Sequence, residues 1–231
     1  MEVSTDAPIA EAEMKIAVLG TGIVGRTLAG KLAALGHSVA MGSRDAANPI
    51  AAQWAAGAGE NAQAATFAGA AAGAELVINA TGGAVSVAVL EAAGAANLAG
   101  KVLIDVGNPL DFSAGFPPSL TIQNTDSLAE TIQRAFPEAR VVKALNTMRA
   151  DLMVNPDRLA GGDHDAFLAG NDVDAKEEVA GILREFGWRP EHIRDLGSLD
   201  SARGLEMWMP LWLRLYASQG DRMFNIKVVS E

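Results

Sequence analysis

The chain of 231 residues contains no cysteine. Without thiols the protein can have no disulfide, no thiolate metal site and no cysteine nucleophile. The three histidines, His37, His164 and His192, are far apart in the sequence, and no two of them have the spacing of a ligand pair. We therefore expect no metal ion. The lack of disulfides is compatible with the cytoplasm, where we expect the protein to be located.

Positive charge and long apolar runs are also scarce. The 18 lysines and arginines are outnumbered by 28 aspartates and glutamates, which gives a formal net charge of −10 and excludes the basic surface of a nucleic-acid-binding protein. The apolar runs fall short of the ~18 residues that a membrane-spanning helix needs, so we expect no membrane partner. The acidic residues 1–13 lack the basic start and apolar middle of a signal peptide, and we expect a flexible N-terminal arm there.

Against this background residues 15–44 contain a recognisable pattern. The apolar residues 16–19 predict a buried parallel strand, which leads into a G-x-G-x-x-G turn. A helical spacing of apolar residues follows as far as Gly36, which we expect to end the helix, and residues 38–41 predict a second strand. This order is typical of a dinucleotide-binding βαβ unit. The contacts expected here are with Gly20, Thr21, Gly22, Ile23, Val24 and Gly25.

Each glycine of the motif has its own expected role. Gly20 lets the chain turn sharply out of the strand, Gly22 lets a pyrophosphate approach the backbone, and Gly25 lets the helix pack closely on the sheet. The amides at the helix N-terminus would face the phosphates. Because a strand precedes the motif and a helix follows it, we favour a nucleotide site over a glycine-rich turn that binds nothing.

The end of the second strand indicates which dinucleotide is bound. An NAD enzyme usually has a carboxylate about 20 residues after the motif, to hold the ribose 2′-hydroxyl. Here Ser43 and Arg44 occupy that place, and Arg44 lies 19 residues past Gly25. A hydroxyl and a guanidinium would bind a 2′-phosphate, which favours NADP over NAD. The next residue, Asp45, is interpreted as a cap for the following helix, near Asn48.

The rest of the chain predicts an α/β fold, a Rossmann-type doubly wound and mostly parallel sheet with a small C-terminal α/β extension. Further strands are predicted at 65–67, 76–80, 102–106, 141–144, 166–170 and 193–196, and helices at 50–56, 85–93, 127–135 and 174–186. Ligands of such sheets lie outside the carboxyl ends of the strands. We therefore expect Ala80, Thr81 and Gly82, after the fourth strand, and Asn108, after the fifth, to contact the cofactor.

We expect residues 14–148 to form the NADP-binding domain and residues 149–231 a small C-terminal domain for substrate binding and dimerisation. Residues 205–216 have apolar side chains on every face of a predicted helix, with a kink or break expected at Pro210. A helix of this kind must be buried, and in so short a chain a second subunit could cover it. We therefore predict a homodimer.

Several stretches, in order, resemble the NADP-dependent oxidoreductases of the deazaflavin coenzyme F420. They are KIAVLGTGIVG, GSR, VLIDVGNPL, VVKALNTM, FLAGND, DLGSLDSARGLEMWMPLW and FNIKVV. Together they span nearly all of the chain from Met14 onward. The chain is also similar to the cytosolic reductase domain of membrane ferric reductases, which binds NADPH and a flavin.

This resemblance implies an NADP-binding Rossmann domain, a homodimer, and a second ring system lying against the nicotinamide. Thr21, Ser43 and Arg44 match the NADP-phosphate pattern, and Asn146 and Thr147 fall in the loop near the two rings. Asn146 departs from the archaeal members, which carry a histidine there. The loop after the fourth strand differs from theirs as well.

Hydride transfer between two rings requires positioning more than acid–base chemistry. The predicted cleft loops carry no His/Asp or Lys/Tyr pair, so Asn146 and Thr147 are the expected catalytic positioning groups, and Asn146 is also a predicted cofactor contact. Lys143 could be a base, but a lysine in an apolar strand more often simply reaches solvent or a carboxylate. We interpret Glu206 as a structural or subunit-interface residue.

The resulting hypothesis is an NADP(H)-dependent oxidoreductase whose partner is a small molecule or cofactor, with hydride passing to or from coenzyme F420 or a flavin-like ring. One alternative is a reductase of a small imine or carbonyl compound, which normally needs a long helical second domain. Only about 80 residues follow Met148 here. The other alternative is a non-catalytic NADP(H)-binding redox sensor.

Overall fold

The structure is a computed structural model that describes residues 13–231, so the arm expected at residues 1–13 lies outside the described residues except for Glu13. An eight-stranded sheet with the order β10-β9-β8-β5-β4-β1-β2-β3 forms the centre of the molecule. Its strands are β1 (Lys15–Leu19), β2 (Ser38–Ser43), β3 (Ala62–Thr66), β4 (Leu76–Asn79), β5 (Val102–Asp105), β8 (Arg140–Ala144), β9 (Ala166–Gly170) and β10 (Ile193–Asp195). Neighbouring strands are parallel except for β8 and β9.

The first six strands of this sheet follow the Rossmann order, with β3, β2 and β1 on one side and β4, β5 and β8 on the other. The predicted fold class is therefore confirmed. The antiparallel β9 and the edge strand β10 extend the sheet beyond β8 and make up the C-terminal α/β extension.

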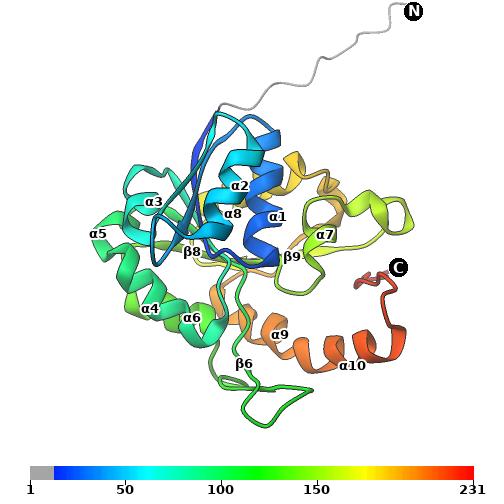
Figure 1. Ribbon diagram of the computed structural model, residues 1–231. Coiled ribbons are helices and arrows are strands. Elements are labelled where there is room, and N and C mark those ends of the chain that lie inside the picture. Colours follow the sequence, from blue (N-terminus) through cyan, green and yellow to red (C-terminus); the bar gives the residue numbers. More distant parts are fainter. Residues whose placement is uncertain (1–12) are drawn as a thin grey trace, which may run out of the picture.

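Helices cover both faces of the sheet. They are α1 (Ile23–Ala34), α2 (Pro49–Ala58), α3 (Phe67–Gly73), α4 (Gly83–Ala93), α5 (Ala95–Leu98), α6 (Leu128–Ala135), α7 (Ala150–Met153), α8 (Val173–Glu185), α9 (Ala202–Met207) and α10 (Met209–Gln219). In Figure 1, α1, α2 and α8 lie on one face, and α3 to α6 lie on the other. The buried side chains accordingly form two main clusters, one on each face.

The place of β1 in the middle of the sheet explains why residues 16–19 are all apolar. Successive side chains of a strand point to opposite faces. Ile16 and Val18 belong to the cluster under α1 and α8, whereas Ala17 and Leu19 belong to the cluster under α3 and α4. Because both faces are covered by helices, every side chain of the strand after Lys15 is buried.

Several element boundaries follow the local signals in the sequence. Gly36 has a φ of 99° just after α1, as expected of a glycine that ends a helix. Ser127 caps α6, because its Oγ accepts from the amide of Glu130 at 3.1 Å and donates to the Glu130 carboxylate at 2.8 Å. At α2 the prediction was wrong, since Asn48 is the cap residue, and the Asp45 carboxylate accepts instead from the amide of Ala47, before the helix begins.

Two further segments differ from the sequence-based expectation. The third strand ends at Thr66, not Phe67, and the alanine-rich residues after it form the unpredicted helix α3, which Thr66 caps. The loop after β5 contains a short hairpin, β6 (Leu110–Asp111) paired with β7 (Ser119–Leu120). Neither segment has an apolar periodicity that would identify it, because one is almost all small residues and the other has only two-residue strands.

The C-terminal helical segment breaks at Trp208, between α9 and α10, and Pro210 lies in the first turn of α10. The break expected at Pro210 is thus found two residues before it. Within one chain Leu205, Met209 and Leu213 are buried, but Leu211 is 52% exposed. A second subunit over this exposed side stays a prediction. The tail after α10 returns to the sheet, where the amide of Val228 donates to the carboxylate of Asp165 at 2.7 Å.

No helix within residues 13–231 is both long and apolar enough to span a membrane. Over the same residues, no three histidine, aspartate or glutamate side chains are placed to hold a metal ion. The histidines instead bond to protein groups: His37 to Glu185, His164 to the backbone oxygen of Pro156, and His192 to Asp165.

Candidate functional site

The carboxyl ends of β1, β2, β4 and β5 lie along one edge of the sheet, next to two adjoining cavities. The first, of about 420 Å³, extends from the glycine turn after β1 to the end of β2. The second, of about 500 Å³, extends from the same turn to the loop after β5. The cavities adjoin at the switch point between β1 and β4, where doubly wound sheets bind their ligands. Both are lined by Gly22, Ala80, Thr81, Gly82 and Val85.

Most residues predicted to contact the cofactor line this pair of cavities. They are Gly20, Thr21, Gly22, Ile23, Val24, Ser43, Arg44, Ala80, Thr81, Gly82 and Asn108. Gly25 and Asn146 do not line either cavity.

The glycine turn has the geometry that a nucleotide phosphate requires. Gly20 has a φ of 123°, and a Cβ at Gly25 would lie 2.1 Å from the backbone oxygen of Gly20, so the turn and α1 pack without room for side chains. A Cβ at Gly22 would meet no atom within 4 Å, because that position faces the open cleft. No side chain caps the N-terminus of α1, and its first turn has no acidic residue. Its amides therefore remain available to an anion.

The end of β2 forms the far wall of the first cavity. Arg44 is exposed there, and no carboxylate among residues 13–231 forms an ion pair with it. The buried Ser43 donates its hydroxyl hydrogen to the backbone oxygen of Asp45. The Asp45 side chain does not line the cavity and accepts from the amide of Ala47 at 2.9 Å. Arg44 thus presents a cationic side chain to the cavity, at the position where an NAD enzyme has a carboxylate.

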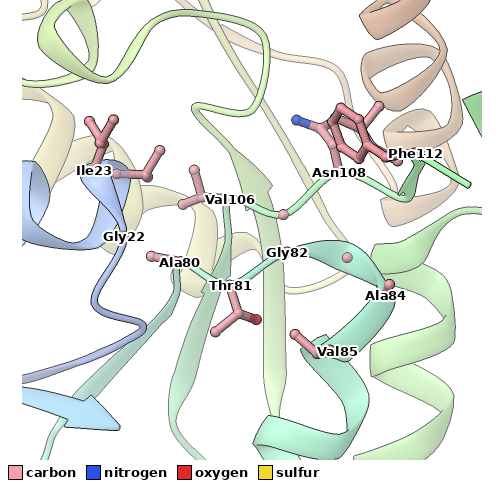
Figure 2. A pocket seen from close by; sticks show the side chains of 14 residues that line it. Gly22, Ile23, Ala80, Thr81, Gly82, Ala84, Val85, Val106, Asn108 and Phe112 are labelled. Carbon is pink, nitrogen blue, oxygen red and sulfur yellow. The ribbon is translucent and has the colours of Figure 1, made fainter. Parts of the chain in front are cut away.

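The second cavity has apolar and uncharged walls. Figure 2 shows Ile23 of α1 at one end and Asn108 and Phe112 at the other, with Thr81 and Val85 of the β4–α4 segment along one side. Among its lining residues in the described chain, none has an ionisable side chain. The polar side chains that line it are the hydroxyl of Thr81 and the amide of Asn108.

A buried polar network underlies this cavity. The Thr81 hydroxyl donates to Oδ1 of Asn79 at 2.6 Å, and the Asn79 amide donates to the Asp105 carboxylate at 2.8 Å. Asp105 also accepts from the amide of Gly107, which fixes the start of the loop after β5. The network therefore joins the ends of β4 and β5 directly beneath the residues that line the cavity.

Lys143 of β8 continues this network away from the cleft. Its ammonium lies 2.8 Å from carboxylate oxygens of both Asp105 and Glu206 and donates to the backbone oxygen of Gly107. Glu206 of α9 in turn accepts from the amide of Leu128 at 2.8 Å, at the N-terminus of α6. Lys143 is completely buried. The structural interpretations of Lys143 and Glu206 are thereby supported by their contacts.

The charges in this triad depend on one another. Burial alone would lower the pKa of the Lys143 ammonium, but Asp105 and Glu206 raise it further, so the pKa lies above its ordinary value. Burial raises the pKa of the Glu206 carboxyl, against the opposing effect of Lys143 and the amide of Leu128. The ammonium therefore keeps its charge at neutral pH and cannot serve as a base there.

Asn146 lies behind the cleft and not in its wall. Its amide donates to Oδ1 of Asn108 at 2.9 Å and to the backbone oxygen of Leu205 at 3.0 Å, while the side-chain amide of Asn108 donates to the backbone oxygen of Asn146. Thr147 is buried beside it, and its backbone oxygen accepts from the indole of Trp208. Asn146 thus contacts the second cavity through Asn108, which lines it. The positioning role predicted for Asn146 and Thr147 stays a prediction.

Some residues around the cavity were not identified from the sequence. Asn79 and Asp105 occupy the last positions of β4 and β5, and they could have been found as polar residues that end apolar strands. Phe112 lies in the unpredicted hairpin. The one signal in the sequence for a role at the site is that a large apolar residue stands there among polar and small ones.

The order of the sheet, the glycine turn at its switch point and the basic residue after β2 define a Rossmann-type oxidoreductase of NADP. Residues 15–109 match the family described as NADP oxidoreductase, coenzyme F420-dependent. The F420-dependent NADP reductase of Methanothermobacter marburgensis is 33% identical over 228 residues, covering 94% of this chain and 99% of that protein. The chain belongs to the family of coenzyme F420-dependent NADP oxidoreductases.

Other relatives extend this comparison. A protein of Arthrobacter sp. FB24, provisionally assigned as an F420-dependent NADP reductase, has a crystal structure with a TM-score of 0.90 and 56% identity, covering 94% of this chain and all of that one. Metalloreductase STEAP3 of Rattus norvegicus is 33% identical over 212 residues; the match covers 89% of this chain but 37% of that protein. A reductive aminase of Aspergillus terreus, in complex with NADPH, has a TM-score of 0.62 at 21% identity, over 90% of this chain and 63% of that one, and this likeness shows the fold alone.

Two glycine substitutions should separate packing from binding at the turn. Gly25→Ala places a methyl group against the backbone of Gly20, so we expect a loss of about 1–3 kcal/mol in the free energy of unfolding. Gly22→Ala meets no protein atom and should cost less than about 1 kcal/mol, but its methyl group should weaken NADPH binding. Urea unfolding and NADPH titration measure the two effects. Unchanged NADPH binding by Gly22→Ala would show that the phosphates do not approach this residue.

Removing the buried lysine should destabilise the whole protein. Lys143→Met leaves two carboxylates buried without their cation, which typically costs about 3–5 kcal/mol in the free energy of unfolding. The control, Arg134→Met, breaks a solvent-exposed pair with Asp126 and should cost at most about 1 kcal/mol. Because the pKa of Lys143 is raised, its stabilisation is fully present at neutral pH and is lost only as the pH rises through that pKa. Equal urea midpoints for the two variants would contradict this account.

Proposed function

We propose that the protein transfers hydride between NADP(H) and a flat ring acceptor of the deazaflavin or flavin type, with coenzyme F420 as the first candidate. The observation that carries the proposal is the second cavity, which adjoins the glycine turn and has no ionisable side chain in its wall. Reduction of a carbonyl or imine needs a proton at the product oxygen or nitrogen, and general acids commonly supply it. A wall without such a group suits transfer between two rings.

The residues of the first cavity fit the adenosine half of NADP. Gly22 leaves space for the pyrophosphate, the free amides of α1 suit its charge, and Arg44 offers a guanidinium for the 2′-phosphate. Since the Ser43 hydroxyl already donates to Asp45, we assign most of the recognition of the 2′-phosphate to Arg44.

The residues of the second cavity hold and orient the reacting rings. The nicotinamide, when bound, supplies or accepts the hydride. Thr81 is fixed by Asn79, and Asn108 by Asn146, so the polar groups of the wall are held in place before any ligand arrives. Ile23, Val85, Val106 and Leu110 provide apolar surface that excludes water from the rings.

The relatives support the same choice of acceptor. The archaeal relative that the chain covers almost completely is named an F420-dependent NADP reductase, and the rat relative a metalloreductase. We place the deazaflavin first for this reason and a flavin second. The exposed side of α10 supports a homodimer, and the lack of cysteine is compatible with the cytoplasm.

We expect the preference for NADP over NAD to depend on the guanidinium of Arg44. Arg44→Ala should weaken NADPH binding at least about tenfold and leave NADH binding almost unchanged, because a hydrogen bond to a charged group is worth about 1.5–3 kcal/mol. Both cofactors are titrated into the wild type, Arg44→Ala and the control Arg134→Ala, which removes an exposed guanidinium that lines neither cavity. Equal losses for NADPH and NADH would exclude recognition of the 2′-phosphate by Arg44.

The acceptor is tested by a panel of single substrates. NADPH oxidation is followed with coenzyme F420, FMN, FAD, a ferric chelate or a small cyclic imine as the sole acceptor. We expect activity with F420, or with a flavin, and none with the imine. Activity with the imine alone would reject the proposal, and tight NADPH binding without any turnover would favour a redox sensor.

A further inference from the structure

The hairpin β6–β7 carries two exposed aromatic side chains. Phe112 is 59% exposed and Phe116 60% exposed, whereas Phe67, Phe136 and Phe186 are buried. A phenyl ring in water loses the favourable burial that holds the other phenylalanines in the core. Exposed apolar side chains at the edge of a cavity commonly mark the place where a ligand packs.

The backbone around Phe112 is well held although its ring is exposed. At the base of the hairpin, Leu110 pairs with Leu120, and the amide of Thr121 donates to the backbone oxygen of Pro109 at 2.8 Å. After Phe112, the amide of Ser113 donates to the Asp111 carboxylate at 2.8 Å. The hairpin therefore fixes the backbone position of Phe112, while the phenyl ring of Phe112 stays exposed.

Only one of the two exposed rings lies at the cleft. Phe112 lines the second cavity together with Asn108 and Leu110, and Phe116 does not line it. In Figure 2, Phe112 lies at the end of the cavity opposite Ile23, and thus away from the first turn of α1. The dinucleotide enters from the α1 end, where the pyrophosphate would bind, so the end with Phe112 is left for the second substrate.

We propose that Phe112 is the stacking wall for the ring of the hydride acceptor, on the side of that ring away from the nicotinamide, and that it selects flat aromatic acceptors over small aliphatic ones. This inference rests on the proposed function. Phenyl groups favour offset stacking on other aromatic systems. A small aliphatic imine has no aromatic face and would gain little from stacking on this ring.

Within the described residues, the second cavity has no other aromatic side chain for this role. Of the residues that line the second cavity in the described chain, Phe112 alone is aromatic, and the remaining apolar ones are aliphatic. The charge of the wall also fits a neutral ring system, because the polar groups there are the Thr81 hydroxyl and the Asn108 amide. Stacking is therefore the main specific contact that this wall can offer to a flat ring.

The test uses FMN and coenzyme F420 as probes with the full chain. Binding of each ring is measured by its fluorescence in the presence of NADP+, and turnover by NADPH oxidation. Phe112→Ala should raise the Kd and KM of the ring at least about tenfold, as removal of a stacking aromatic typically does. Phe112→Trp should restore binding, and Phe112→Leu, apolar but not flat, should not. NADPH affinity and the urea midpoint should stay at the wild-type values in all three variants.

The matched control is Phe116→Ala, which removes an equally exposed ring from the same hairpin and should leave ring binding unchanged. If Phe112→Ala binds and reduces the rings as the wild type does, or if Phe116→Ala loses as much, the inference is wrong while the proposed function stands. If the wild type binds a ring through Phe112 without turnover, the inference stands and the proposed function falls. If the wild type binds neither ring, both are wrong.

Discussion

The structure around the cleft depends on a single buried cation. Lys143 pairs with the carboxylates of Asp105 and Glu206, and all three side chains are buried from solvent. Without its ammonium, two buried carboxylates would lose the cation that compensates their charge. Through these contacts it connects β8 to the end of β5, and α9 to the first turn of α6. It also bonds the backbone of Gly107, where the loop toward Asn108 and the hairpin begins. The positions of the cavity wall are therefore supported by an ion triad whose three residues line neither cavity.

The same arrangement explains how charge is distributed at the site. Ionised groups beneath the second cavity are paired with one another below its surface, while its wall keeps only uncharged polar groups and apolar side chains. The first cavity has an exposed guanidinium instead, at Arg44. One half of the cleft is thus suited to an anionic nucleotide, and the other to an uncharged, largely apolar ligand surface.

Much of this could be predicted from the sequence, because it depends on local signals. The glycine turn, the apolar strands and Gly36 each determine the nearby backbone, and the strand order follows from the rules of doubly wound sheets. What could not be predicted depends on contacts between distant segments. The triad joins residues 105, 143 and 206, whose proximity no spacing indicates. The pairing of Asn146 with Asn108, and the place of Phe112 at the cleft, likewise require the folded sheet.

The most direct test of the central claim follows one hydrogen atom. NADPH carrying deuterium at C4, on one face or the other, is oxidised by the enzyme with coenzyme F420 as acceptor in ordinary water. Hydride in the deazaflavin is received by a ring carbon, so a transferred deuterium does not exchange. Direct transfer between two stacked rings predicts deuterium in the reduced acceptor from one face only, and none in the water. Deuterium in the water, or an acceptor reduced without deuterium whichever face of NADPH carries the label, would contradict the account.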